Sequence, residues 1–247
     1  MNGLSDRVAI VTGAAQGIGR AVCERLTREG VSVAAFDLSE EGGQQAVNDG
    51  VAALFVACNV RDPAQIDAAM RRVADALGTP TILVNNAGWD VIGPFLESDE
   101  SIWVDLVEVN LLGPLYLAKR VAPLMRDAGG GAIVNIASDA GRVGSTGEVL
   151  YSGAKGGIIA ASKSLAREFA GLGIRVNCVS PGPTDTPLFR RIADRNPKLM
   201  NSVVRAVPLG RPAESAEIAN AIAFLASDEA SFITGQTLSV SGGLTMV

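Results

Sequence analysis

The stretch that decides the fold is residues 7–30, which read RVAIVTGAAQGIGRAVCERLTREG. The apolar run at its start predicts a buried strand, and the helical spacing of apolar residues at its end predicts a helix. Between them, Gly13, Gly17 and Gly19 let backbone amides approach a phosphate at the positive N-terminus of that helix. The spacing is G-x-x-x-G-x-G instead of the commoner G-x-G-x-x-G, but a glycine turn between a strand and a helix still predicts a dinucleotide site.

The rest of the chain repeats this alternation of apolar runs and amphipathic stretches. The expected strands cover 7–12, 31–37, 52–57, 81–85, 132–137, 175–180 and 237–240. The expected helices cover 17–29, 63–77, 100–125, 151–171 and 215–227. Continuous apolar strands separated by helices indicate a parallel sheet covered on both faces. We therefore expect an α/β fold, a single Rossmann-type domain over 1–247 with a doubly wound parallel sheet of about seven strands and helices on both faces.

Composition argues against several classes of function. The chain has 247 residues and a formal net charge of -5, which gives no electrostatic reason to bind nucleic acid. It contains three widely spread cysteines and no histidine, so we expect no metal site and interpret the cysteines as buried residues of a reducing compartment. The start lacks a basic signal-peptide region, and no apolar run reaches the ~18 residues that cross a bilayer. We expect a cytoplasmic protein that does not associate with membranes.

An acidic residue ends the second expected strand. Asp37 lies eighteen residues after Gly19, where a carboxylate can accept hydrogen bonds from both ribose hydroxyls and would repel a 2′-phosphate. Gln16 and Leu38 supply no positive charge for that phosphate. We therefore expect NAD(H) to be preferred over NADP(H); the alternative is an exposed aspartate that caps a loop.

A second motif carries proton chemistry. Tyr151 and Lys155 are four residues apart, so they share one face of a helix, and Ser138 precedes them by thirteen residues. Free tyrosine has a pKa of about 10, but a nearby cation favours phenolate and lowers that pKa. Tyrosine can then serve as acid or base in a chain without histidine. A Tyr-x-x-x-Lys spacing alone also arises by chance on exposed helices.

The segment 183–212 departs from the strand–helix alternation. It carries apolar residues between prolines and would cover the carboxyl-terminal edge of the sheet, where open α/β sheets bind ligands. We interpret it as a substrate lid, with a connecting loop as the alternative. Its basic residues outnumber its acidic ones: Arg190, Arg191, Arg195, Lys198 and Arg205 against Asp185 and Asp194. These cations either form a solvated helix face or meet the phosphates of a carrier such as coenzyme A.

Taken together, these motifs resemble the short-chain dehydrogenase/reductase family over essentially the whole chain. Besides the glycine turn, the chain has Asn-Asn-Ala-Gly at 85–88 and Pro-Gly at 181–182. The resemblance implies a catalytic set of Asn110, Ser138, Tyr151 and Lys155. It implies that the dinucleotide is bound by Gly13, Gln16, Gly17, Ile18, Gly19, Asp37, Asn59, Val60, Asn86, Ala87, Gly88, Tyr151, Lys155, Pro181, Gly182, Thr184 and Thr186.

The resemblance also implies a role for each member of the catalytic set. Tyr151 would exchange a proton with the substrate oxygen, which Ser138 would also hydrogen-bond. Lys155 would lower the pKa of the tyrosine and bind the nicotinamide ribose, and Asn110 would hold a water that links Lys155 to solvent. The chain departs from the family pattern at Asn59 and at Ser241, where the family usually has aspartate.

The substrate is less clearly indicated. The strings at 85–90, 138–145, 181–186 and 238–246 are similar to those of 2-hydroxycyclohexanecarboxyl-CoA dehydrogenases, members of the family that oxidise a cyclic β-hydroxyacyl-CoA with NAD. This resemblance implies a small-molecule substrate, and an acyl-CoA as its best candidate. Candidate substrate contacts are Trp89, Asp139, Arg142, Glu148, Arg190 and Arg191.

Three alternatives stay open. One is a 3-oxoacyl-carrier-protein reductase, which usually uses NADPH, and another is a dehydrogenase of small cyclic or secondary alcohols without a carrier. The third is a dinucleotide sensor without catalysis, although such proteins commonly lose the tyrosine or the lysine. By analogy with the family we also expect a homotetramer, assembled through the helices over 100–125 and 151–171.

Overall fold

A computed structural model of the chain describes residues 1–195 and 197–247. The side chains of residues 192, 195 and 198–201 lie outside this description, and with them the predicted lid cations Arg195 and Lys198.

One parallel sheet of seven strands forms the centre of the molecule, as the apolar runs predict. The strands are β1 (Val8–Thr12), β2 (Ser32–Asp37), β3 (Leu54–Ala57), β4 (Pro80–Asn85), β5 (Gly131–Ile136), β6 (Ile174–Pro181) and β9 (Thr237–Val240). Their spatial order is β3-β2-β1-β4-β5-β6-β9, so the order reverses between β1 and β4. Open α/β sheets bind ligands at such a reversal, beyond the carboxyl ends of the strands.

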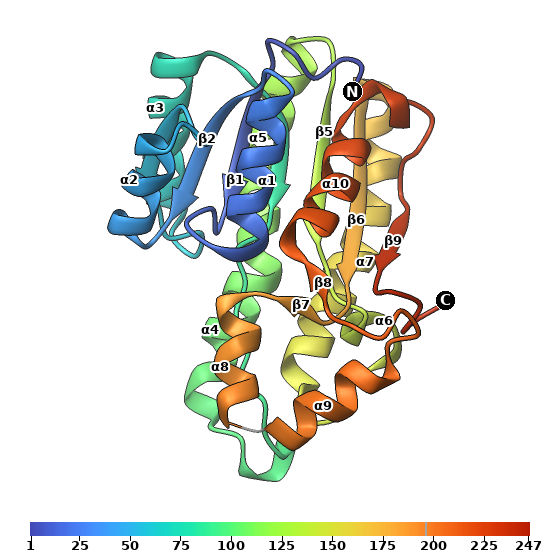
Figure 1. Cartoon of the computed structure of the whole chain (residues 1–247). Helices are drawn as coiled ribbons and strands as arrows, with labels where there is room; N and C mark the ends of the chain where they lie inside the picture. The colour runs from blue at the N-terminus through green and yellow to red at the C-terminus, as the bar shows by residue number, and fades with distance from the viewer. Residues whose placement is uncertain (196) are drawn as a thin grey trace.

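Helices cover both faces of this sheet (Figure 1). They are α1 (Gly17–Arg28), α2 (Glu40–Asn48), α3 (Pro63–Leu77), α5 (Gly113–Asp127), α7 (Val149–Phe169) and α10 (Ser215–Ala226). Strand residues alternate between two cores: Ala9 and Val11 pack with α1 and α10, whereas Val8 and Ile10 pack with α3 and α5. Both faces are buried, and for this reason apolar residues predominate on both faces of the strands. The predicted doubly wound fold is confirmed.

The helix α2 was not expected from the sequence. Its residues include Gly42 and Gly43, and glycine in a helix interior costs about 1 kcal/mol relative to alanine. Packing explains the glycine at 43, because a Cβ there would lie 2.1 Å from ring carbons of Phe55 on β3. The contact between Gly43 and Phe55 therefore outweighs the low helix propensity of glycine, on which a prediction from sequence relies.

The expected helix over 100–125 is one helical path with a widened turn in its middle. It passes through η2 (Glu100–Ile102), α4 (Trp103–Val107), the π-helical turn η3 (Glu108–Leu112) and α5. Pro114 has no N–H to donate to the carbonyl of residue 110, so the regular α-helical bond is missing there. A π-turn accommodates such a defect, and it is often found at functional sites. Asn110 lies within this turn and is completely buried.

The segment between β6 and α10 forms a separate layer beyond the carboxyl ends of the strands. It contains β7 (Thr184–Asp185), α8 (Pro187–Arg195), α9 (Pro197–Ala206) and β8 (Ala213–Glu214). β7 and β8 pair in parallel, and the N–H of Ala213 donates to the Pro183 carbonyl at 2.8 Å. Figure 1 shows α8 and α9 on the side to which the strand arrows point. Both helices thus lie within the predicted insertion at 183–212.

Short helical turns complete the described chain. They are η1 (Phe95–Glu97), α6 (Ala140–Val143), η4 (Ala170–Leu172) and η5 (Asp228–Ala230). The helical stretch Glu100–Asp127 is long and apolar enough to cross a membrane by length and composition alone, a test that core helices of soluble proteins also pass. In the fold this stretch packs along the sheet and reaches the site through its π-turn.

The contact between Gly43 and Phe55 yields a stability prediction. Gly43→Ala would gain helix propensity but force the Phe55 ring to move, and overpacking of this kind costs about 1–3 kcal/mol. We expect a lower free energy of unfolding in urea. Gly153→Ala is the matched control, because Gly153 is helical and a Cβ there meets nothing within 4 Å. An unchanged Gly43→Ala protein would show that this contact does not require glycine.

Candidate functional site

Thr12, the last residue of β1, joins the two motifs that flank the reversal of strand order. Its hydroxyl accepts hydrogen bonds from the backbone N–H groups of Asn86 (3.0 Å) and Ala87 (2.9 Å). The Asn86 side chain donates in return to the carbonyls of Thr12 (2.9 Å) and Gly13 (3.1 Å). These bonds hold the Asn-Asn-Ala-Gly segment after β4 against the glycine turn after β1.

The glycine turn fits a dinucleotide because its residues leave the backbone open. A Cβ at Gly19 would lie 2.0 Å from the Gly13 carbonyl oxygen, and one at Gly13 (φ 64°) would lie 2.9 Å from Cα of Ala87. Gln16 is the N-cap residue of α1, but its side chain makes no cap hydrogen bond. The first amides of α1, including those of Gly17 and Ile18, therefore present the positive end of the helix to a phosphate.

Asp37 lies at the carboxyl end of β2, beside the glycine turn. Its two oxygens accept hydrogen bonds from the backbone N–H groups of Ala15 and Ser39, each at 2.9 Å. These bonds fix the carboxylate next to the turn and satisfy only part of its capacity, since a carboxylate has about four acceptor sites. The neighbouring side chain, Leu38, is apolar and 71% exposed.

The expected adenine contacts follow β3. The Asn59 side-chain oxygen accepts a hydrogen bond from the Arg61 backbone at 3.1 Å. Val60 is buried against α5, because a Cβ at Gly113 would lie 3.0 Å from both its side chain and its carbonyl oxygen. Arg61 also pairs with Glu108 at 2.8 Å and with Asp105, so this loop is tied to the π-turn of Asn110.

The residues after β6 reach the same turn from the opposite side. Gly182 packs so tightly on β9 that a Cβ would lie 2.8 Å from Cα of Ser241. The Thr184 hydroxyl donates to the Gly182 carbonyl at 2.9 Å, and the Thr186 hydroxyl accepts from the Phe189 amide at 3.1 Å. A Cβ at Gly17 would lie 3.3 Å from the Thr186 methyl group. Pro181 to Thr186 therefore lie beside the glycine turn.

Lys155 is a buried cation at the centre of the site. It is 3% exposed, and its Nζ donates to the Ile136 carbonyl at 2.7 Å. Nζ also lies 5.5 Å from the centroid of the Tyr151 ring. Burial disfavours the charged ammonium and lowers its pKa to about 8, although Cys178 and Asp90 act in the opposite direction. A modest change in surroundings therefore decides whether this group is charged.

The expected lowering of the Tyr151 pKa is not found in the protein alone. Burial raises that pKa above its ordinary value, and the negative charges of Asp90 and Glu148 raise it further. The hydrogen bond with Ser138 acts in the lowering direction. Lys155 is not among the influences on this pKa, although its ammonium lies over the ring face, 5.5 Å from the ring centroid.

Asn110 and Gly88 line the floor beside Lys155. The Asn110 amide donates to the carbonyls of Trp89 (2.8 Å) and Leu106 (3.0 Å), whereas its buried Oδ1 has no described partner. A Cβ at Gly88 would lie 2.7 Å from this Oδ1 and 3.4 Å from Lys155 Nζ. An unpaired acceptor beside a buried ammonium is suited to a bridging water. Ser138 thus meets Tyr151, Tyr151 meets Lys155, and Gly88 lies next to both Lys155 and Asn110.

Comparison with known proteins identifies the family. A family model described as enoyl-(acyl carrier protein) reductase matches residues 13–245. The chain is 42% identical over 243 residues to the 3-oxoacyl-(acyl-carrier-protein) reductase FabG of Escherichia coli K12, covering 98% of each chain. It is 37% identical to the protein of that name from Staphylococcus aureus Mu50, covering 96% of this chain and 98% of the relative.

The chain belongs to the short-chain dehydrogenase/reductase family. Among solved structures, the ligand-free aldohexose dehydrogenase of Thermoplasma acidophilum superposes with a TM-score of 0.89 at 35% identity, over 98% of this chain and 94% of the other. This short-chain dehydrogenase/reductase is therefore an oxidoreductase that acts on CH–OH groups and binds a nicotinamide dinucleotide.

The predicted substrate contacts of this family member do not all gather at Tyr151. Glu148 is the N-cap residue of α7, one helical turn before Tyr151. Asp139 is 5% exposed and its oxygens accept from the Ser239 hydroxyl at 3.0 and 2.9 Å, so this carboxylate ties α6 to β9. Arg142 is directed to Asp139, with 4.0 Å between the charged atoms.

The lid residues and the loop after Gly88 also differ from expectation. Arg190 forms a two-pronged pair with Asp185 at 2.7 and 2.8 Å, whereas Arg191 is exposed. Trp89 offers its carbonyl to Asn110. Asp90, which the family pattern does not single out, has a pKa raised to about 7 by burial and by the neighbouring Glu148. Its position two residues after the Asn-Asn-Ala-Gly motif is the signal in the sequence that could have indicated it.

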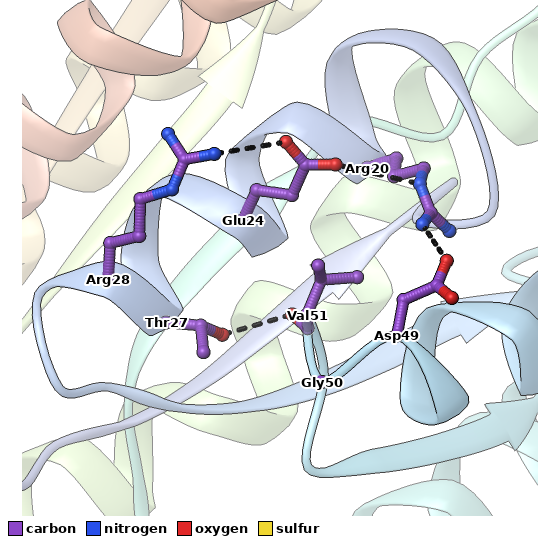
Figure 2. Close-up of a pocket in the computed structure, with 7 residues that line it drawn as sticks. All are labelled: Arg20, Glu24, Thr27, Arg28, Asp49, Gly50 and Val51. Atoms are coloured by element: carbon purple, nitrogen blue, oxygen red, sulfur yellow. Dashed lines mark hydrogen bonds and ion pairs between the residues drawn. The ribbon is translucent and has the colours of Figure 1, made fainter.

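Two surface hollows lie apart from these residues. One, of about 360 Å³, lies between α1 and the turn after α2 and is lined by Arg20, Glu24, Thr27, Arg28, Asp49, Gly50 and Val51 (Figure 2). Arg20 pairs there with Asp49, and Glu24 lies 3.6 Å from Arg20 and 3.7 Å from Arg28. The other is lined by Lys163, Ala166, Arg167, Ala170, Thr234, Gly235 and Gln236. Neither includes a residue of the proposed site.

The buried Thr12 hydroxyl yields a first prediction for the site. Thr12→Val would leave the amides of Asn86 and Ala87 without their acceptor, and an unsatisfied buried group costs about 1–3 kcal/mol. We expect a lower free energy of unfolding and weaker dinucleotide binding, measured by urea titration and calorimetry. Thr12→Ser keeps the hydroxyl and should retain most of both. Equal behaviour of the two variants would contradict this role.

Lys155 yields a prediction about pH. The folded chain releases the Lys155 proton above about pH 8, whereas an unfolded lysine holds it to about pH 10.4. The unfolded state therefore binds more protons in this window, so stability contributed by this site rises with pH. Relative to Lys155→Met, wild-type unfolding free energy should increase by about 1–3 kcal/mol between about pH 8 and pH 10. A constant difference between the two proteins across this window would show an unperturbed lysine.

Proposed function

We propose that this protein interconverts the hydroxyl and ketone of a β-hydroxyacyl or β-oxoacyl thioester, with NAD(H) as the preferred dinucleotide. The single observation that carries the reaction is the buried Lys155 ammonium beside Tyr151, whose hydroxyl bonds with Ser138. The names of the relatives, which refer to 3-oxoacyl groups on a carrier protein, support the substrate class.

The residues that would hold the dinucleotide come from four strand ends. The glycine turn would bind the pyrophosphate, Asp37 the adenine ribose, and Asn59 with Val60 the adenine. The segment from Pro181 to Thr186 would lie along the nicotinamide, and Lys155 would bind its ribose. The bound dinucleotide supplies or accepts the hydride.

The proton is moved by this chain's own residues. Tyr151 would donate its phenolic proton to the ketone oxygen in reduction and take it back from the alcohol in oxidation. Ser138 would hydrogen-bond the same oxygen and so hold the reacting carbon in place. Lys155 would return the proton through a water held by the free Oδ1 of Asn110. Because the pKa of Tyr151 is raised in the protein alone, its hydroxyl stays protonated and can act as an acid.

The preference for NAD(H) rests on Asp37. Its carboxylate is fixed beside the glycine turn by two backbone hydrogen bonds, so it cannot swing away to admit a 2′-phosphate. No cation within the described residues pairs with it, and Leu38 follows it. The relatives named as 3-oxoacyl-carrier-protein reductases do not settle this preference for the present chain.

The nature of the carrier is a finer question. Coenzyme A and a carrier protein both attach the acyl group as a thioester, and a carrier has phosphates or acidic groups that lid cations can meet. Arg191 and Arg205 are exposed on α8 and α9, whereas Arg190 is already paired with Asp185. We therefore assign carrier contact to Arg191 and Arg205 in preference to Arg190. The cyclic 2-hydroxycyclohexanecarboxyl-CoA type remains one proposed member of this substrate class.

A second candidate is a dehydrogenase of small alcohols without a carrier. The carboxyl groups of Asp90 and Glu148 near Tyr151 favour it, because carboxylates accept hydrogen bonds from extra hydroxyl groups. The solved aldohexose dehydrogenase has this fold. A sensor without turnover has less support, since Tyr151 and Lys155 are both present and in contact.

We also propose a homotetramer in the cytoplasm. Only 33% of the most apolar part of Glu100–Asp127 is buried within one chain, which leaves apolar surface for a partner. All three cysteines are buried and free, as in a reducing compartment. Sedimentation at working concentration tests the assembly.

The role of Tyr151 is tested by Tyr151→Phe. We expect dinucleotide affinity within about twofold of wild type and a loss of kcat of at least about 100-fold, because general acid–base catalysis contributes 10²–10⁴-fold. The assay follows reduced dinucleotide with acetoacetyl-CoA, an acetoacetyl carrier protein and cyclohexanone as substrates. Substantial turnover by this variant would refute the assignment of Tyr151 as the proton carrier. Turnover of cyclohexanone alone by wild type would favour the carrier-free candidate.

The role of Asp37 is tested by Asp37→Ala. Removing the carboxylate should lower the ratio of kcat/KM with NADH to kcat/KM with NADPH by at least about tenfold, equivalent to about 1.4 kcal/mol. Asp75→Ala is the control, because this exposed carboxylate lies near the end of α3, away from the glycine turn. A wild-type preference for NADPH, or an unchanged ratio in Asp37→Ala, would overturn the proposed cofactor preference.

A further inference from the structure

Two loops meet next to Tyr151 and bring two carboxyl groups together. The loop after Gly88 carries Asp90, and the turn before α7 carries Glu148. The Gly93 amide donates to the Gly147 carbonyl at 3.0 Å, which joins the loops. The approach is close enough that a Cβ at Gly147, where φ is 81°, would lie 3.2 Å from Ile92. The proximity of the two acids is therefore built into the backbone.

Asp90 is the inner member of this pair. Both of its carboxyl oxygens are buried, and neither receives a well-formed hydrogen bond from a described donor. The group that it meets is the carboxyl of Glu148. A negative charge beside a buried carboxyl makes its ionisation more costly. Burial and this contact raise the pKa of Asp90 to about 7.

Glu148 is the outer member. It is only partly buried, and unlike Asp90 it has no carboxyl oxygen hidden without a partner. Its backbone carbonyl accepts from the Ser152 amide at 2.7 Å, which fixes it one turn before Tyr151. Glu148 is therefore fixed beside Asp90 and close to Tyr151.

The pair acts electrostatically on the groups around it. From α7, the phenol of Tyr151 feels the charges of both acids, and the ammonium of Lys155 feels Asp90. From the end of β5, Ser138 contributes a hydroxyl that bonds with Tyr151. From the loop itself, the Val91 amide favours the ionised form of Asp90. Lys155 is partly neutralised by burial, so the pair leaves this side of the site negative.

We propose that Asp90 and Glu148 select substrates by charge: they admit a carbonyl compound that is neutral around its reacting carbon and reject one that carries a free carboxylate there. This inference rests on the proposed function and adds the charge of the substrate that the site accepts. A thioester or ester is neutral at this position, whereas the corresponding β-oxo acid is an anion. Repulsion of the unwanted form is a recognised source of specificity.

The selection should depend on pH. Below about pH 7 Asp90 is protonated and neutral, and above it Asp90 is ionised. The negative charge on Asp90 strengthens the repulsion of an anion but leaves a neutral substrate almost unaffected. Discrimination against the free acid therefore increases as Asp90 loses its proton.

The experiment compares ethyl acetoacetate with acetoacetate, which differ in the charge next to the same ketone. For the full-length protein with reduced dinucleotide, we expect the ratio of kcat/KM for ester over acid to rise roughly tenfold between about pH 6 and pH 8.5. Asp90→Asn and Glu148→Gln should lower this ratio and flatten its pH dependence. Glu97→Gln, which neutralises an exposed carboxyl near the same loop, should behave as wild type.

A binding measurement separates this inference from the proposed reaction. In the Tyr151→Phe protein, calorimetry should give a weaker Kd for acetoacetate than for the ester, and Glu148→Gln should narrow this gap. Charge discrimination in binding without turnover of either compound by wild type would overturn the reaction and support the selection. Ratios in Asp90→Asn and Glu148→Gln that match wild type at every pH would overturn the selection, whatever the reaction.

Discussion

The hydrogen bond from the Lys155 ammonium to the Ile136 carbonyl joins α7 to the end of β5 at the centre of the site. It holds the ammonium where almost no solvent reaches, and this burial lowers the pKa of Lys155 to about 8. Tyr151, Asn110 and Gly88 are all arranged around this ammonium. A shorter or neutral side chain at this position would lose the contact between the ammonium and the Tyr151 ring.

The segments around Lys155 are closely packed against one another. The glycine turn, the Asn-Asn-Ala-Gly segment and the segment after β6 touch at distances that leave no room for side chains. The Thr12 hydroxyl fixes two of these segments, and the β7–β8 ladder carries the third toward α8 and α9. The segments at the reversal of strand order between β1 and β4 are thus closely packed against one another.

Most of the sheet could be predicted from the sequence because strands that are buried on both faces are rich in apolar residues. The ends of all seven strands lie within two residues of the expected ends. The helix α2 was missed because Gly42 and Gly43 look unfavourable until Phe55 is seen against them. The π-turn was missed as well, although Pro114 marks the carbonyl of Asn110 as the one that loses its α-helical partner.

For the site, the sequence indicated which residues meet but not their electrostatics. Family motifs brought Ser138, Tyr151 and Lys155 together, and the structure connects them. The sign of the Tyr151 pKa shift could not be predicted from spacing, because burial and the charges of Asp90 and Glu148 raise this pKa. The sequence also could not show that the Asp139 carboxylate accepts a hydrogen bond from Ser239.

For Tyr151 to act as a base, its pKa must fall when the dinucleotide binds. The positive charge of bound NAD⁺ would lower it. The chain has two tyrosines, Tyr116 and Tyr151, so Tyr116→Phe leaves one phenol to observe. Ultraviolet difference titration of this variant should show Tyr151 ionising above the range of free tyrosine in the protein alone, and at distinctly lower pH with saturating NAD⁺. A titration that the dinucleotide leaves unchanged, or moves upward, would contradict the account.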